Sequence, residues 1–271
     1  MIAKRLKGDL FRWLMMLLSA VILLFIIAPL IGMALHTGSR EFFETVADDT
    51  VRESVWFTLR ISFLSTLFFS VGAIPLAYIM ARRSFPGKKV IQGIIDLPVV
   101  IPHTAAGIAL LGLISREGII GKAAGLAGMN LINNPVGTAL AMAFVSIPFM
   151  VNSARDGFLG VPEKLEKAAL SLGASRSRAF FSISVPLAWR SIISGFVMMF
   201  ARGMSEFGAV VIVAYHPMTA PVMIYERFNS FGLSYARPLS LLFVLVALVI
   251  FVLFRMVSLE RKVKPKLPGD A

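Results

Sequence analysis

Asp96, Arg202 and Glu206 are charged residues that lie inside long apolar stretches of the sequence. A charge in apolar surroundings is costly, so such positions are candidates for an ion pathway or for a buried ion pair. Arg202 and Glu206 are four residues apart, which places them on one face of a helix where they can neutralise each other. We interpret them as a structural ion pair that holds a helix bundle or a dimer together. Direct contact with a substrate is the alternative.

Two further charged residues have simpler interpretations. We expect Asp96 to cap a helix or to form an ion pair with one of its basic neighbours Arg82, Arg83 and Lys88. Arg60 lies near the start of an apolar stretch, and its long side chain can reach the lipid headgroups. We prefer this position for Arg60 to a role in attracting anions.

Pro98 and Pro102 interrupt one apolar stretch, and the small residues 104–107 follow them. Each proline removes a backbone donor, which a membrane tolerates only where protein or a watery cavity satisfies the freed carbonyl groups. Such a site suits a pathway or a gate, and prolines that only shape helix packing are the alternative. We predict the pathway or gate residues as Pro102, His103, Thr104 and Ser205.

Motifs for catalysis or cofactor binding were not found in the sequence. It contains no Gly-rich loop that ends in Gly-Lys-Ser/Thr, no Gly-x-Ser-x-Gly and no cysteine. The three histidines His36, His103 and His216 are too dispersed to suggest a metal site. We therefore expect no catalytic residue, metal or cofactor on this chain, with a membrane-embedded enzyme as the alternative.

Residues 160–186, called the elbow below, have the pattern of helix, glycine, helix. Pro162 suits a first helical turn, and Gly173 can adopt the left-handed conformation that ends a helix. Ser175 is placed to cap the next helix. The small Ala168 and Ala169 allow another protein to approach the backbone closely, so we expect the elbow to be a docking site.

The elements around these residues are apolar and long. Of the 271 residues 57% are hydrophobic and 15% are charged, and the mean hydropathy is +0.81, which is typical of a membrane protein. We predict an all-α polytopic membrane protein with one transmembrane domain, residues 1–271, and six spans. The spans are residues 13–35, 55–81, 90–115, 136–154, 191–214 and 239–259.

The net charge of +12 follows from the topology. Most of the 27 basic residues fall in the N-terminal segment, in residues 82–89 and 155–190, and after residue 254, which predicts that both termini are cytoplasmic. This distribution explains the charge without a nucleic-acid partner. The acidic loop 36–54 is on the opposite side, where we expect a short surface helix that can touch an external partner.

The elbow resembles the EAA loop of the membrane subunits of ABC importers, in which Glu-Ala-Ala is followed by a glycine and later by Ile-x-Leu-Pro. In this sequence Lys167 occupies the place of the Glu, with Glu166 just before it, and Val185 replaces the Leu. The spacing is kept by Ala168, Ala169, Gly173, Ile183 and Pro186. The resemblance implies a type I importer fold and a coupling loop at about residues 155–190. The coupling residues that it implies are Glu166, Lys167, Ala168, Ala169, Gly173 and Ala174.

Residues 96–111, 201–209 and 215–225 are similar to segments of molybdate, tungstate and sulfate permeases. The resemblance implies a homodimer in a prokaryotic cell membrane that imports molybdate or tungstate. It also implies two cytoplasmic ATPase subunits that bind ATP and Mg, and an external oxyanion-binding protein. A permease for sulfate or another small anion and an ion-gradient-driven secondary carrier remain alternatives.

Overall fold

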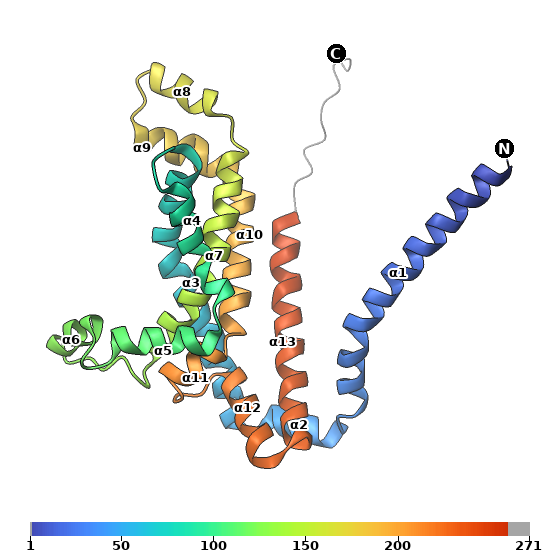
Figure 1. The fold of residues 1–271 in the computed structure, drawn as a ribbon. Helices are drawn as coiled ribbons and strands as arrows, with labels where there is room; N and C mark the ends of the chain where they lie inside the picture. The colour runs from blue at the N-terminus through green and yellow to red at the C-terminus, as the bar shows by residue number, and fades with distance from the viewer. Residues whose placement is uncertain (1, 260–271) are drawn as a thin grey trace.

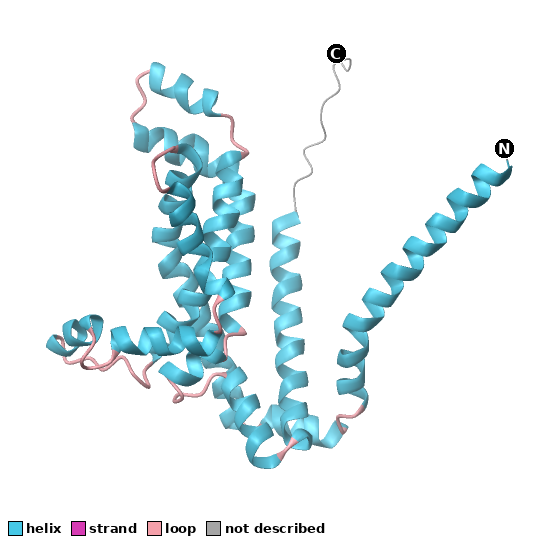
Figure 2. Cartoon of the chain, viewed as in Figure 1, coloured by secondary structure: helices cyan, strands magenta, loops and turns pink. Residues whose placement is uncertain are grey.

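The computed structural model describes residues 2–259, whose regular structure is helical throughout (Figures 1 and 2). The helices are α1 Ile2–Leu35, α2 Ser39–Ala47, α3 Asp49–Arg82, α4 Lys88–Val100, α5 His103–Ile114, α6 Ile119–Leu126, α7 Pro135–Leu159, α8 Glu163–Ser171, α9 Arg176–Ala179, the π-helix η1 Phe180–Ser184, α10 Val185–Met204, α11 Gly208–Val213, α12 Ala220–Phe231 and α13 Leu233–Leu259.

The predicted spans agree with the structure, with two changes of shape. Five of the described helices are long and apolar enough to cross a membrane, and α4 with α5 gives a sixth span if this pair, which is bent by 112°, is counted as one. The break is at Ile101 and Pro102. Since a residue before a proline is pushed out of the helical region, Ile101 is extended, with φ −73° and ψ 147°. The span predicted at residues 90–115 is therefore broken, and the break falls at Pro102, one of the two prolines expected to disturb the helix.

The fifth predicted span, residues 191–214, is also broken. The helix α10 already begins at Val185, ends at Met204, and is followed after a short non-helical link by the separate helix α11. The two broken spans meet, because α11 packs against α5. Their shared core includes Ala106, Leu110 and Ala209.

The centre of the bundle is formed by α3, α7 and α10, with α4 beside α7. Serine hydroxyl groups of α3 donate hydrogen bonds to backbone carbonyl groups of the two neighbouring helices. Ser62 donates to the carbonyl of Phe200 at 3.0 Å, and Ser65 donates to that of Ala139 at 2.8 Å. Such bonds and small side chains hold helices together where lipid weakens the hydrophobic drive.

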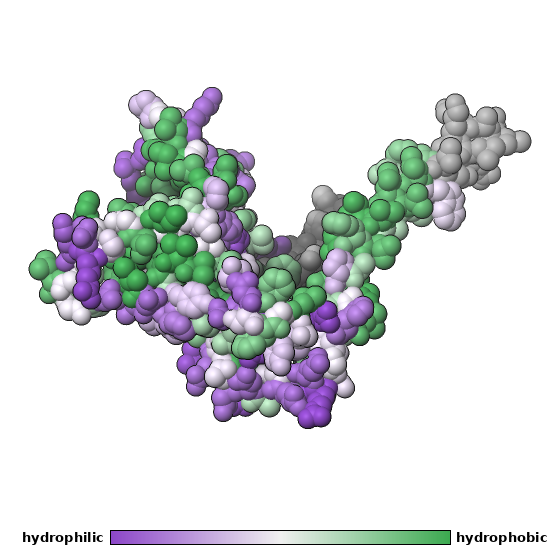
Figure 3. All heavy atoms as spheres, turned by 60° about the horizontal axis from the view of Figure 1, so that its bottom comes forward, coloured by the Kyte–Doolittle hydropathy of each residue, from purple (hydrophilic) through white to green (hydrophobic). Residues whose placement is uncertain are grey.

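The predicted surface helix in the acidic loop 36–54 is confirmed as α2, which lies at the end opposite the elbow with α12 (Figure 1). Hydrophilic residues gather over this end, and α1 is covered by hydrophobic ones (Figure 3). The side chains of residues 11–31 in α1 are exposed, so this helix has little protein around it in the single chain. The start of α1 and the end of α13 point toward the elbow end of the bundle (Figure 1).

Candidate functional site

The elbow has the predicted helix–glycine–helix form. The helix α8 ends at Ser171, and Gly173 has φ +86°, a conformation that other residues rarely adopt. The backbone N–H of Ala174 donates to the carbonyl of Ala169 at 3.0 Å, which closes the end of α8. The Ser175 hydroxyl accepts from the N–H of Arg178 at 3.2 Å and caps α9, as predicted. Pro162 is the residue just before α8 and not part of its first turn.

The outer surface of the elbow is open and carries most of the predicted coupling residues. Lys167, Ala168 and Gly173 are exposed, while Ala169 and Ala174 are half-buried. Lys167 forms an exposed ion pair with Glu163 at 3.1 Å, and the other exposed charges on the elbow are basic: Lys164, Arg176 and Arg178. A partner can therefore approach the backbone at Ala168 and meets a largely positive surface.

Glu166 points the other way and is buried, with 9% of its surface exposed. Its carboxylate accepts hydrogen bonds from Tyr78 Oη at 2.8 Å, from Arg82 Nε at 2.8 Å and Nη2 at 2.6 Å, and from Ser184 Oγ at 2.8 Å. Arg82 also donates to the carbonyl of Val161 at 2.9 Å. These donors come from α3 and η1, so one side chain of α8 ties the elbow to the bundle. Sequence reasoning placed Glu166 in the coupling set but did not identify these partners.

The electrostatics of Glu166 follow from this geometry. Burial by itself raises the pKa of the carboxyl, but the hydrogen bonds from Arg82, Tyr78 and Ser184 outweigh it and lower the pKa below the ordinary value of 4.5. Glu166 is therefore ionised at neutral pH and forms a largely buried ion pair with Arg82.

A second polar cluster lies where the two broken spans meet. Arg202 Nη2 is 2.8 Å from Glu206 Oε2, so the predicted ion pair is confirmed. The two residues do not share one helix, because α10 ends at Met204. Glu206 is fully buried, and its Oε1 accepts from the N–H of Ala209 at 2.8 Å, at the start of α11. Glu206 thus fixes both the end of α10 and the beginning of α11.

His103, a predicted gate residue, completes this cluster at the first position of α5. Its Nδ1 is 3.3 Å from Glu206 Oε2, and Arg202 Nη2 is within 2.9 Å of both imidazole nitrogens. Gly208 permits this packing, because an added Cβ would be 2.7 Å from the His103 Cβ. The histidine, the arginine and the carboxylate form one group across the breaks, and the arginine charge is balanced within it.

The other predicted gate residues surround this group. Ser205 is exposed, and its hydroxyl donates to the carbonyl of Arg202 at 3.1 Å. Pro102 and Thr104 are exposed beside His103 at the start of α5. Two residues that carry hydroxyl groups are therefore exposed beside the cluster, while Glu206 within it is fully buried.

Asp96 has neither of the two roles predicted for it, a helix cap or an ion pair with Arg82, Arg83 or Lys88. Its carboxylate accepts from Asn152 Nδ2 at 2.6 Å and from Gln92 Nε2 at 2.9 Å, and Gln92 also donates to Asn152 Oδ1 at 2.8 Å. It does not pair with Arg82, because that guanidinium is bound to Glu166. The missed signal was the presence of two amide side chains inside apolar stretches, one of them a helical turn before Asp96. Arg60 is exposed, and its guanidinium lies 4.8 Å from the ring centre of Trp56.

The chain matches the family described as "binding-protein-dependent transport system inner membrane component" over residues 73–265, and it belongs to this family. It is a membrane-spanning transport permease. The molybdate/tungstate transport system permease of Thermococcus kodakarensis is 40% identical over 251 residues, which cover 92% of this chain and 96% of that protein. The permease of the same name from Methanocaldococcus jannaschii is 42% identical over 236 residues, 87% of this chain and 92% of that protein.

A probable sulfate permease of Chlorokybus atmophyticus is more distant, with 30% identity over 249 residues, 89% of this chain and 86% of that protein. Among solved structures, a bacterial ABC transporter for the import of alginate matches with a TM-score of 0.74 and 20% identity, over 95% of this chain and 98% of that one. The MetNI methionine ABC transporter matches with a TM-score of 0.59 and 14% identity, over 77% and 92%. The fold is therefore that of type I ABC importer permeases.

The pH dependence of stability tests the buried Glu166. Because its pKa is lower in the folded chain, its stabilising contribution is complete above the unfolded value of 4.5 and is lost as the pH falls through the folded value. In detergent, the midpoint of thermal unfolding should fall more steeply with acid below about pH 4.5 in the wild type than in Glu166→Gln. The control is Glu163→Gln, which removes an exposed carboxylate. A wild-type slope equal to that of Glu166→Gln contradicts the assignment.

A double-mutant cycle tests the pair at the span breaks. Arg202→Met leaves a buried carboxylate unbalanced, and Glu206→Gln leaves the arginine unbalanced. The losses of unfolding free energy in the two single variants should therefore add up to more than the loss in the double variant. We expect a coupling free energy of roughly 1–3 kcal/mol from unfolding measurements. The matched control is the exposed pair Arg40 and Glu44, which has the same spacing and a 2.8 Å contact. Its coupling should be only about 0.3–0.5 kcal/mol, and equal coupling in both pairs rejects a special role for the buried one.

Proposed function

We propose that this chain is the membrane-spanning subunit of an ABC importer that moves molybdate or tungstate into the cell. The observation that carries the substrate class is the 40–44% identity to molybdate/tungstate permeases over most of the chain, against 30% for the sulfate permease. Two copies form the pore, two ATPase subunits bind ATP and Mg inside, and an external binding protein delivers the oxyanion. The chain itself has no catalytic role.

The elbow is the docking site for the ATPase subunit. Its exposed side offers small residues at Ala168 and Ala169 and a bend at Gly173, so a cleft on the partner can enclose it. Its buried side is held to α3 and η1 by Glu166. A push or pull on the elbow is therefore transmitted to α3 and, through η1, to α10.

The gate is at the meeting point of the broken spans. The helix α10 ends at the cluster of His103, Arg202 and Glu206, so a displacement of α10 changes the contacts of that cluster with α5. Because Glu206 balances Arg202, this arginine is not free to retain a dianion at the gate, and Thr104 and Ser205 supply hydroxyl groups instead. Weak binding favours release, as conduction requires. Substrate selection then resides mainly in the binding protein.

A substitution at Gly173 tests the coupling role. Gly173→Val strains a backbone at φ +86° and moves the bend of the elbow, while the space around this residue is open. In the reconstituted complex we expect inserted protein, transport reduced at least about tenfold, and loss of the ATPase stimulation by loaded binding protein. Gly232→Val is the control, because Gly232 has φ +82° and open surroundings at the other end of the bundle. Normal stimulated ATPase in Gly173→Val rejects the coupling role.

Titration of the cognate binding protein tests the substrate. Molybdate and tungstate should bind at least about tenfold more tightly than sulfate, a difference of about 1.4 kcal/mol. Calorimetry with each anion separately measures this ratio. Preference for sulfate would leave the importer class intact and overturn the proposed substrate.

Full transport by the chain alone in liposomes, driven by an ion gradient, would overturn the importer class in favour of a secondary carrier.

A further inference from the structure

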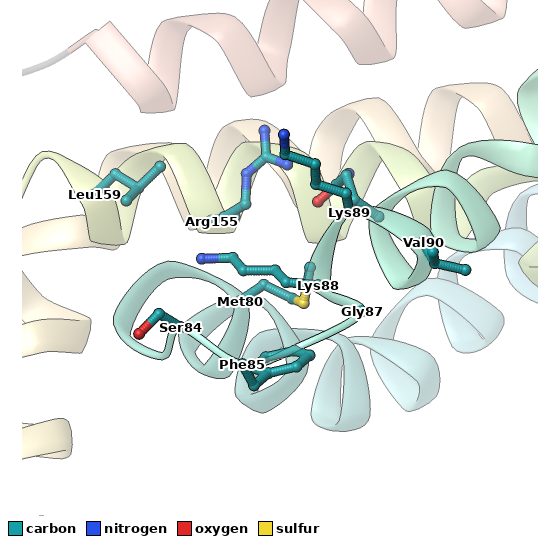
Figure 4. Close-up of a pocket in the computed structure, with 10 residues that line it drawn as sticks. Met80, Ser84, Phe85, Gly87, Lys88, Lys89, Val90, Arg155 and Leu159 are labelled. Carbon is teal, nitrogen blue, oxygen red and sulfur yellow. The ribbon is translucent and has the colours of Figure 1, made fainter.

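A hollow of about 720 Å³ opens at the elbow end of the bundle, beside the Asp96 group, with which it shares Gln92 (Figure 4). It lies between the end of α3, the loop that follows, the start of α4 and the end of α7. Its lining residues are Met80, Ser84, Phe85, Gly87, Lys88, Lys89, Val90, Gln92, Arg155 and Leu159. Three of these ten residues are basic, and the lining contains no carboxylate.

The three basic side chains line the same hollow. In Figure 4 the ends of Lys89 and Arg155 lie together in the view, and the side chain of Lys88 lies between Arg155 and Phe85. Lys88 Nζ donates to the carbonyl of Arg83 at 3.0 Å. Arg155 contacts one carboxylate, the exposed Asp156 next to it in sequence, at 2.9 Å. Three positive charges with one exposed carboxylate beside them leave an excess of positive potential that suits an anion.

The start of α4 adds to this potential. The helix begins at Lys88 after Gly87, whose φ is +82°, and no side chain caps it. The first N–H groups of a helix have no partner within it and carry a partial positive charge, which favours a phosphate. The 13-residue helix α4 therefore directs its positive end at the region where Lys88 and Lys89 lie.

The walls of the hollow are apolar and open to the surroundings. Val90 and Leu159 are exposed hydrophobic side chains at its edge, 66% and 57% exposed. Met80 and Phe85 lie beneath the lysine side chains in the view of Figure 4. A small hydrated oxyanion gains nothing from such walls. A molecule with an anionic head and hydrocarbon chains gains from both the charges and the walls.

We propose that this hollow binds an anionic phospholipid of the leaflet at the elbow end. Lys88, Lys89, Arg155 and the start of α4 hold the headgroup phosphate, and the acyl chains lie along Val90 and Leu159. The lipid thereby restrains the loop that follows Arg82, the residue that holds Glu166. This proposal needs only that the chain spans a membrane, so it stands apart from the substrate and coupling proposals.

Native mass spectrometry of the full chain with defined lipids tests the proposal. The chain, purified in detergent, is mixed with equal amounts of phosphatidylglycerol and phosphatidylcholine, and the retained lipids are counted. We expect preferential retention of phosphatidylglycerol, with a fall of about fivefold for each lysine removed in Lys88→Gln/Lys89→Gln. The matched control is Lys164→Gln/Lys167→Gln, which removes two exposed lysines from the elbow and should leave retention unchanged.

Further arms separate the possible outcomes. If the lysine variant does not fold, Arg155→Gln replaces it and should reduce retention in the same direction. Inorganic phosphate at millimolar concentration should not displace the lipid, since it cannot use the apolar walls. Equal retention of the two lipids, equal loss in the control variant, or displacement by inorganic phosphate each overturns the proposal.

Discussion

The carboxylate of Glu166 attaches the elbow to the helix bundle, and the position of the elbow depends on it. Three residues donate four hydrogen bonds to it, and they belong to α3 and η1, far apart in the chain. An ionised carboxylate is buried only when such partners balance the loss of water, and removal of one partner is strongly destabilising. The elbow therefore cannot move freely on the bundle. In our account this attachment is why force on an exposed loop reaches helices inside the membrane.

A second constraint acts where the spans break. Lipid cannot satisfy free backbone groups, so a broken helix at membrane depth must be covered by protein or line water. Both breaks lie together, at Ile101–Pro102 and between α10 and α11, and Glu206 satisfies the N–H of Ala209 there. Arg202 in turn balances Glu206. The two breaks, where the helical hydrogen bonds are interrupted, are thus stabilised by interactions between charged side chains. This arrangement suits a gate that rearranges without unfolding.

Local features were predictable from the sequence, and long-range ones were not. Gly173 and Ser175 act through neighbouring residues, so the shape of the elbow followed from their types and spacing. The lengths of the apolar stretches predicted the positions of the spans in the same way, and this holds also for the two spans that are broken in the structure. Pro102 indicated a disturbance, but the 112° bend depends on how α5 packs against α11.

The pairing of Glu166 with Arg82 joins residues that are 84 positions apart, and no local pattern encodes it. Asp96 was assigned to basic neighbours in sequence for the same reason, although Asn152 on α7 is its partner in space. The ion pair of Arg202 and Glu206 was predicted correctly on the assumption of a continuous helix, which the structure corrects. Close spacing brought the two charges together in either geometry.

Crosslinking of the elbow to the ATPase subunit tests the central claim most directly. The chain has no cysteine, so single cysteines can be placed without a background. Leu172 in the elbow is 89% exposed, and Leu126 at the end of α6 is 93% exposed and serves as the control. In membranes that contain the complete importer, Leu172→Cys should crosslink to the ATPase subunit in a manner that changes with nucleotide, and Leu126→Cys should not. Free labelling of Leu172→Cys without any crosslink, or crosslinking of Leu126→Cys instead, would contradict the account.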